Sequence, residues 1–176
     1  MMCGRFQPFH TGHLNYLRLV AAKPERFIVG ITNPDPTVIK EEQGSDHRHR
    51  LDSNPFTYFE RQAMIRETLR DEGIPEDRYT VTPFPVSVPE LWKYYIPDHV
   101  VQHMPVFSEW EARKAQRFRD LGHDVILLDA LSKPPSATDV RERIVNGQDW
   151  KELVPPGVAR VLAEILSKGP RPGLTF

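Results

Sequence analysis

The sequence contains almost no cysteine: Cys3 is the single one among 176 residues. An internal disulfide and a cysteine-based metal cluster are therefore excluded. No apolar run approaches the roughly 20 residues that a membrane-spanning helix needs, and the first residues lack the basic and then apolar pattern of a signal peptide. The formal net charge is −1, so no excess of one sign indicates a nucleic-acid or membrane partner. We expect a soluble cytoplasmic protein.

The composition is that of one ordinary globular domain. Hydrophobic residues make up 39% and charged residues 27% of the chain, which is typical of soluble proteins. The 17 prolines fall between periodic segments and indicate loops rather than disorder. We therefore predict a single domain over residues 1–176.

Apolar strands and amphipathic helices alternate along the chain. Strands are predicted over residues 27–31, 79–84, 100–106 and 125–128, with a very short one over 1–3. Helices are predicted between them, and a helical segment over about 139–167 follows. This alternation predicts an α/β fold, a Rossmann-like doubly wound parallel sheet, whose ligands bind at the carboxyl ends of the strands. Residues 38–53 are polar and without periodicity, and we predict a long flexible loop there.

The first loop carries the strongest chemical signal. It reads Gly4-Arg5-Phe6-Gln7-Pro8-Phe9-His10-Thr11-Gly12-His13 and leads from a strand into a helix. A helix N-terminus binds anions through its free N–H groups, and Gly12 leaves room for a phosphate near the backbone. His10 and His13 are suited to donate hydrogen bonds to phosphate oxygens, and Arg5 adds a cation. Two histidines at this spacing are also consistent with a chance arrangement around a turn or with a metal site.

A second motif lies before the predicted helix that starts near residue 137. It reads Pro135-Ser136-Ala137-Thr138-Asp139-Val140-Arg141. Ser136 or Thr138 is predicted to cap the helix, whose N–H groups then face the same edge of the sheet. Arg141 lies within reach of a polyphosphate. The alternative for this motif alone is a plain helix cap.

Together the two motifs resemble those of the nicotinamide-mononucleotide adenylyltransferases, particularly the archaeal type, within the HxGH nucleotidyltransferase superfamily. Residues 4–13 are similar to that family's opening motif almost letter for letter, and Ser136, Thr138 and Arg141 match its Ile-Ser-x-Thr-x-x-Arg signature. Segments 54–57, 60–61 and 149–155 are similar in order and spacing. The resemblance covers the chain from Gly4 to about Leu166.

The resemblance implies a reaction and a set of site residues. An acceptor phosphate oxygen attacks the α-phosphorus of a nucleoside triphosphate, and pyrophosphate leaves without a covalent enzyme intermediate. His13, His10 and Arg141 are the implied catalytic residues. Mg²⁺ is the implied cofactor, carried mostly by substrate oxygens and water, so no protein metal ligand is named. The implied nucleotide-binding residues are Gly4, Arg5, Phe6, Gln7, Phe9, His10, Gly12, His13, Pro135, Ser136, Thr138 and Arg141.

The acceptor side departs from the family pattern. Residues 32–37 replace a Gly-Ser-Ala-type turn with a stiffer, acidic one, and residues 102–105 replace a Ser-Gly-Asn-Pro-like stretch. Thr32, Asn33 and Asp35 are candidate acceptor contacts, although a turn role is favoured for Asp35. Trp92 lies where the family has an aromatic near the nicotinamide ring, but its apolar neighbours favour core packing. The run 46–50 either binds phosphate or forms a solvated loop, and the second is favoured.

The sequence leaves three candidate functions. The leading one is AMP transfer from ATP to nicotinamide mononucleotide, forming NAD. The second is AMP or CMP transfer to another phosphorylated or phosphonate small molecule. The third is a nucleotide-sensing module with little turnover, which the intact His10, His13 and Arg141 disfavour. The partners expected are small molecules, not nucleic acid or membrane, and the resemblance implies a homo-oligomer.

Overall fold

The computed structural model describes residues 1–22, 25–35, 37, 51–106, 109–128, 135–171 and 173–174. The strands are β1 (Met2–Gly4), β2 (Phe27–Ile31), β3 (Tyr79–Pro83), β4 (Gln102–Pro105) and β5 (Val125–Leu128). The α-helices are α1 (Thr11–Ala21), α2 (Tyr58–Asp71), α3 (Glu109–Asp120), α4 (Ala137–Val145) and α5 (Pro156–Ser167). Among the short 3₁₀ helices, η2 (Leu51–Ser53) precedes α2 and η4 (Pro89–Tyr94) precedes β4. The element order follows the predicted alternation closely.

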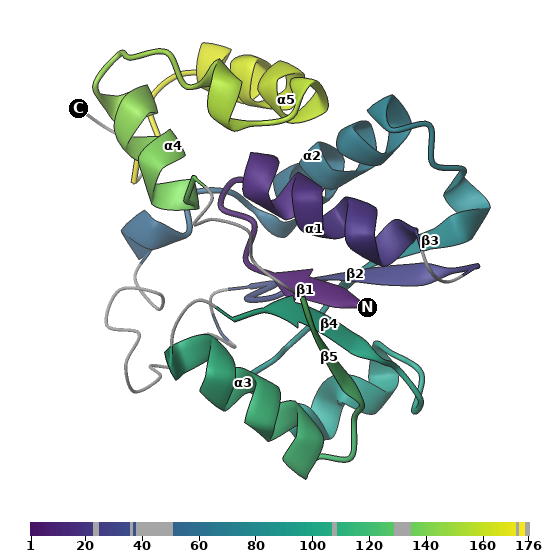
Figure 1. The fold of residues 1–176 in the computed structure, drawn as a ribbon. Coiled ribbons are helices and arrows are strands. Elements are labelled where there is room, and N and C mark those ends of the chain that lie inside the picture. Colours follow the sequence, from purple (N-terminus) through teal and green to yellow (C-terminus); the bar gives the residue numbers. More distant parts are fainter. Residues whose placement is uncertain are drawn as a thin grey trace.

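The strands form two parallel ladders, β3-β2-β1 and β4-β5, which adjoin at β1 and β4 to give the overall order β3-β2-β1-β4-β5 (Figure 1). β2 pairs with β1 and β3, and β4 pairs with β5. Two backbone bonds, Met1 N–H to Val101 O and His103 N–H to Met1 O, both 2.7 Å, place β4 beside β1. The order reverses between these two strands, which is the position where ligands bind in open α/β sheets. The predicted doubly wound parallel sheet is confirmed.

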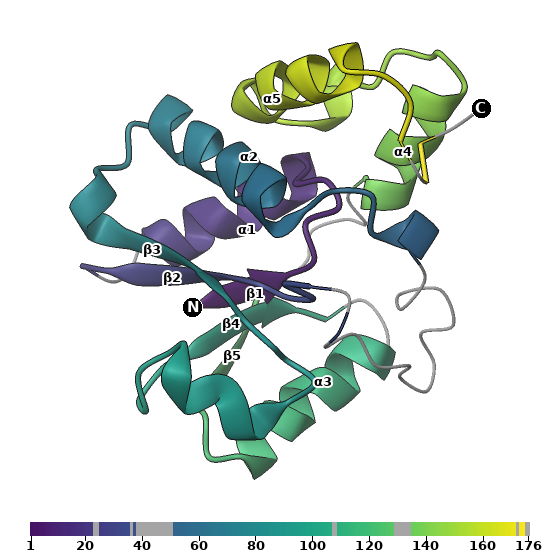
Figure 2. The same ribbon diagram turned by 180° about the vertical axis from the view of Figure 1, so that it is seen from behind.

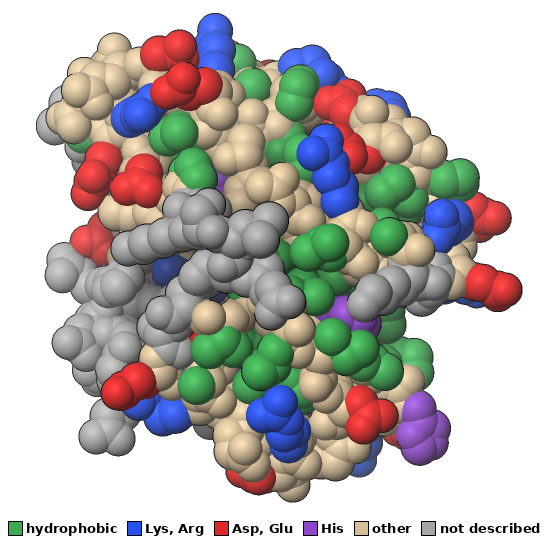
Figure 3. Space-filling model, viewed as in Figure 1, with side chains coloured by type: hydrophobic (Ala, Val, Ile, Leu, Met, Phe, Trp, Pro, Cys, Tyr) green, Lys and Arg blue, Asp and Glu red, His purple; other side chains and the backbone are tan. Residues whose placement is uncertain are grey.

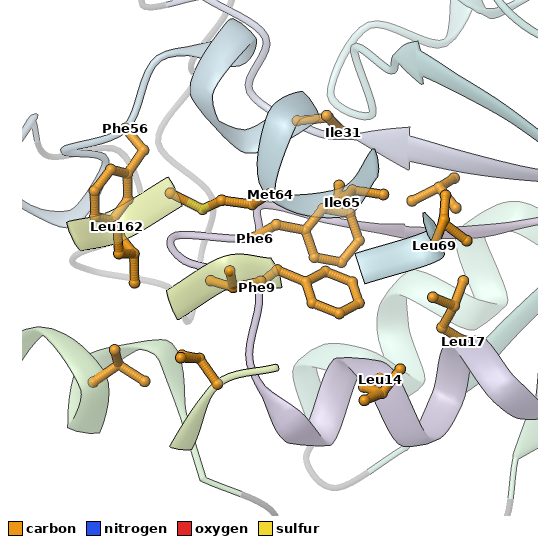
Figure 4. Close-up of a cluster of buried hydrophobic side chains, with 14 of the residues drawn as sticks. Phe6, Phe9, Leu14, Leu17, Ile31, Phe56, Met64, Ile65, Leu69 and Leu162 are labelled. Atoms are coloured by element: carbon orange, nitrogen blue, oxygen red, sulfur yellow. The ribbon is translucent and has the colours of Figure 1, made fainter. Parts of the chain in front are cut away.

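Helices cover both faces of the sheet (Figures 1 and 2). α1 and α2 lie on one face, with α5 packed outside α2, while α3 and η4 lie on the other face. Each face has its own hydrophobic cluster. The main cluster includes Phe6, Phe9 and Phe56, and Figure 4 shows these rings among aliphatic side chains of α1, α2 and α5. The second cluster includes Phe84, Trp92 and Phe118.

The α2–α5 contact is close because Gly157 has no side chain. A Cβ there would lie 2.7 Å from the backbone carbon of Glu67, closer than real Cβ atoms approach. After α5 the chain returns to the segment before α2. Arg171 donates to both carboxylate oxygens of Glu60 at 2.8 and 2.6 Å, and Leu174 is buried in the main cluster. The C-terminal segment thus fixes the start of α2.

Of the loop predicted over residues 38–53, the structure describes only the last three residues. Residues 51–53 form η2, Ser53 is buried, and a Cβ on Gly173 would clash with the Asp52 carbonyl oxygen. Residues 51–53 are therefore a packed turn, and the flexible loop stays a prediction for the residues before them. Residues 38–50, including the 46–50 run, lie outside the described residues.

The surface agrees with the balanced composition. Figure 3 shows acidic and basic side chains interspersed over the face viewed there. Among the described residues, every helix is too short or too polar to cross a membrane.

Candidate active site

The loop between β1 and α1 places two imidazoles face to face. His10 is the N-cap residue of α1, and its backbone N–H donates to Nδ1 of His13 at 3.2 Å. The two ring centroids are 3.6 Å apart. Because Nδ1 of His13 accepts a hydrogen bond, the hydrogen of the neutral ring is on Nε2. His13 therefore has a donor left for a ligand at the helix N-terminus.

Burial keeps both imidazoles neutral. It lowers the pKa of His10 to about 4, against the opposing effect of the Asp139 carboxylate. The pKa of His13 lies well below its ordinary value because of burial first, and then because of His10 and Arg5. A bound polyphosphate raises both pKa values, since a nearby anion favours the protonated form. The pair is thus a neutral donor site that gains positive character when an anion arrives.

The second motif forms a capped helix start, as predicted. Ser136 is the N-cap of α4, and its hydroxyl accepts from the Asp139 N–H at 3.2 Å. In return the Asp139 carboxylate accepts from the Ser136 N–H at 2.6 Å. Pro135 directly precedes this cap. This reciprocal cap fixes the direction of α4, whose first N–H groups are anion donors.

Arg141 joins the two motifs, although 134 positions separate it from its partner. Its Nη1 donates to the Gln7 carbonyl oxygen at 2.6 Å, and its Nη2 donates to the Thr138 hydroxyl at 3.1 Å. The side chain is buried, and burial lowers its pKa, opposed by Asp52 and Glu142. A guanidinium remains protonated at neutral pH even so. The structure therefore brings the predicted sequence motifs together at one edge of the sheet.

Several motif residues that we predicted to bind nucleotide also hold the loop in place. Phe6 and Phe9 are 1% and 0% exposed and point into the main core (Figure 4). The Gln7 amide donates to the Phe56 carbonyl at 3.0 Å and accepts from the Phe56 N–H at 2.9 Å. A Cβ on Gly4 would lie 2.8 Å from the Phe6 ring. These residues shape the loop backbone through packing and hydrogen bonds, and the assignment of Phe6, Gln7 and Phe9 to nucleotide binding stays a prediction.

Arg5 and Gly12 remain beside the imidazoles. The Arg5 guanidinium donates to the Ser53 carbonyl at 3.4 Å, and its charge is near enough to lower the pKa of His13. Gly12 is buried in the first turn of α1. Their part in binding phosphate stays a prediction.

The acceptor-side candidates lie at the end of β2. Thr32 is buried, and Asn33 has a left-handed backbone with φ of 50°. The Asp35 carboxylate accepts from the Thr37 N–H at 2.8 Å and from the Thr37 hydroxyl. This is a side-chain-stabilised turn, the role favoured for Asp35 from the sequence.

Trp92 is a packing residue. Its side chain is 4% exposed, and its ring centroid lies 5.1 Å from those of Phe84 and Phe118. Its Nε1–H donates to the Pro85 carbonyl at 3.0 Å. Trp92 was a candidate for substrate stacking, and the structure favours the alternative because both the ring and its polar group are already engaged.

Sequence reasoning gave no role to Arg61, which is buried beneath the site. Its guanidinium donates to the carbonyl oxygens of Arg5, Thr32 and Asn33 at 2.9, 2.7 and 2.7 Å. The only available signal was its place in the 60–61 segment that resembles the family. Among the described residues, no group of three or more His, Cys, Asp or Glu side chains is placed to bind a metal.

Comparisons with known proteins agree with this geometry. The cytidylyltransferase-like family matches residues 1–143. A phosphonoformate cytidylyltransferase from Streptomyces viridochromogenes is 41% identical over 92% of this chain and 88% of its own length. A nicotinamide-nucleotide adenylyltransferase from Thermococcus kodakarensis is 34% identical over 94% of this chain and 82% of its own length.

A solved structure shares the fold. It is a bifunctional NMN adenylyltransferase/ADP-ribose pyrophosphatase from Francisella tularensis, complexed with AMP and a manganese ion, with a TM-score of 0.60 and 19% identity. The match covers 96% of this chain and 55% of the solved one, so our chain corresponds to about half of that protein. The family match over residues 1–143, with these relatives, shows that the chain belongs to the cytidylyltransferase-like family and is a nucleotidyltransferase.

Proposed function

We propose that the protein transfers AMP from ATP to nicotinamide mononucleotide, releasing pyrophosphate and forming NAD. The observation that carries the transfer chemistry is the His10–His13 pair, joined to the α4 N-terminus through the 2.6 Å bond from Arg141 to Gln7 O. The acceptor is taken from the archaeal relatives, which are named nicotinamide-nucleotide adenylyltransferases.

In the proposed reaction the protein positions two substrates and donates hydrogen bonds. A phosphate oxygen of the acceptor forms a bond to the α-phosphorus, and the bond from that phosphorus to the bridging oxygen of pyrophosphate breaks. Nε2–H of His13 donates to an α-phosphate oxygen as negative charge develops there. Arg5, Arg141 and the first N–H groups of α4 bind the remaining phosphates. No protein side chain forms a covalent bond.

A divalent cation, Mg²⁺ in this proposal, neutralises charge on the triphosphate. In this proposal the cation is carried by phosphate oxygens and water. The Asp139 and Asp52 carboxylates lie near His10 and Arg141, respectively. Each is thus close to the proposed phosphate subsite.

A second candidate is CMP transfer from CTP to a small phosphonate. The relative at 41% identity is named for such a reaction. In addition, Trp92, at the position expected to border nicotinamide, is buried and presents no exposed ring. The Asp35 carboxylate is engaged by Thr37. A compact acceptor needs no such ring.

Pyrophosphate release discriminates between these candidates. The purified protein is assayed with Mg²⁺ and either ATP or CTP, each with nicotinamide mononucleotide, with phosphonoformate, or with no acceptor. Release that requires ATP and nicotinamide mononucleotide, with stoichiometric NAD, supports the first candidate. Release that requires CTP and phosphonoformate supports the second and refutes the first. Triphosphate binding without release in any combination contradicts both candidates and favours a nucleotide sensor.

A further inference from the structure

Arg61 is a charged residue in the interior of the protein. It lies in the first turns of α2 and is 2% exposed, which places it among the largest fully buried side chains of the described residues. Burial lowers the pKa of its guanidinium to about 10, opposed by Tyr58 and Glu60. The side chain therefore stays positively charged at neutral pH.

The guanidinium bonds to backbone carbonyl oxygens of three separate segments. Nε donates to Thr57 O at 3.2 Å, at the N-cap of its own helix. Nη1 donates to Arg5 O at 2.9 Å and to Thr32 O at 2.7 Å, and Nη2 donates to Asn33 O at 2.7 Å. None of the salt bridges of the described residues involves Arg61. All four of these hydrogen bonds therefore hold backbone carbonyl groups in place.

The three segments have different places in the site. Arg5 belongs to the loop that carries His10 and His13, whereas Thr32 and Asn33 begin the acceptor-side turn after β2. Asn33 is in the left-handed region with φ of 50°, a conformation that persists in a non-glycine residue when its surroundings fix it. The planar guanidinium has a fixed spacing between its N–H groups. It therefore fixes the distance between the two loops.

We propose that Arg61 is a positioning residue. It holds the loop that carries His10 and His13 and the turn that begins at Thr32 in the relative position that in-line attack on the α-phosphorus requires. This inference rests on the proposed nucleotidyl transfer. Arg61 acts through the backbone of Arg5 and Asn33 and does not touch substrate. A displacement of about 1 Å between reacting groups costs on the order of 10²-fold in rate.

The test compares Arg61→Lys with Arg70→Lys, which makes the same change in the same helix at an exposed position whose partner is Glu67. An ammonium group cannot span three carbonyl oxygens in the guanidinium geometry. We expect Arg61→Lys to lower kcat by about 10²-fold while the Kd for the triphosphate changes less than about fivefold. Hydrogen exchange should accelerate in peptides covering residues 4–7 and 30–33. Arg70→Lys should match the wild type in all three measurements.

The outcomes separate this inference from the function on which it rests. Wild-type protein that releases no pyrophosphate refutes the proposed function, and the exchange data then decide on Arg61 alone. An Arg61→Lys variant with control-like turnover or unchanged exchange in both segments overturns the positioning role. So does a variant in which kcat and triphosphate affinity fall equally.

If Arg61→Lys does not melt cooperatively, native-state exchange of the wild type supplies the decision. At low denaturant, amides near residues 6, 33 and 61 should open as one cooperative unit. Independent opening of the two loops would overturn the inference.

Discussion

His13 has two roles in this structure that two substitutions separate. Its Nδ1 accepts from the His10 N–H at 3.2 Å and so completes the helix cap, while its Nε2–H is the proposed donor to the α-phosphate. Alanine removes both. Asparagine retains an oxygen at the position of Nδ1 but lacks the atoms that extend to Nε2. Asp139, with a side chain as long as that of asparagine, makes the equivalent capping bond to Ser136 N at 2.6 Å in α4.

The structure gives a magnitude for each role. Loss of a cap costs about 1 kcal/mol, or about 2–4 °C in Tm for a chain of this size. Both variants also lose the ring contacts with Phe6 and Phe9 at 4.9 and 5.3 Å, worth about 0.5–1.5 kcal/mol each. Removal of a donor to a developing oxyanion costs about 10²- to 10³-fold in kcat.

We therefore expect His13→Ala and His13→Asn to lose kcat equally, by about 10²- to 10³-fold, while the asparagine variant melts about 2–4 °C above the alanine variant. Triphosphate Kd should stay within about tenfold of the wild type, because the lost interaction strengthens in the transition state. The measurements are steady-state pyrophosphate release, calorimetric melting and isothermal titration with the triphosphate. A kcat within tenfold of the wild type in either variant would refute the proposed role of Nε2–H.

Three other predictions follow. The folded-state pKa of His10 is about 4 against an ordinary value of 6.5, so the unfolded chain binds the proton first and stability should fall by up to about 3 kcal/mol from pH 6.5 to pH 4. Urea midpoints of His10→Asn should fall less over that range, and parallel curves would contradict the reasoning. Gly157→Ala should lower the free energy of unfolding by about 1–3 kcal/mol, since a backbone carbon lies 2.7 Å from the new Cβ; kcat should not change, and an unaltered or raised Tm would show that the helices separate freely. Arg171→Ala should lower the free energy of unfolding by about 1–2 kcal/mol, because its two hydrogen bonds to Glu60 are lost. Lys168→Ala, which removes an exposed ion pair, should lower it by less than about 0.5 kcal/mol. Equal effects of the two substitutions in denaturant melts would refute this difference.

The fold was predictable because local signals agreed with one another. The apolar run at Phe27–Ile31 is a strand with the predicted bounds, and the Thr57 and Ser136 capping boxes start α2 and α4. Each depends on neighbours in sequence, which pattern reasoning can evaluate. The packed turn at 51–53 was missed because its partner, Gly173, is more than 100 positions away.

The proximity of His10, Gly12 and His13 was predictable for a different reason. All three residues belong to one short segment at the start of α1, so their proximity follows from their spacing in the sequence. Arg61 was not identifiable, because an arginine after a glutamate in an amphipathic helix has the same local pattern whether it is buried or solvated. Its role depends on backbone carbonyls 28 and 56 positions away. Trp92 was ambiguous because its aromatic surroundings depend on α3 as well as η4.

The division of the core by the sheet has a consequence for divergence within the family. The loop with His10 and His13 and the helix with Arg141 rest on the main cluster, whereas β4, η4 and α3 rest on the second. Mutations that repack the second cluster leave the supports of the first unchanged, because side chains of opposite faces do not touch through a sheet. Selection can therefore alter the half that rests on the second cluster while the loop with His10 and His13 and the helix with Arg141 keep their supports.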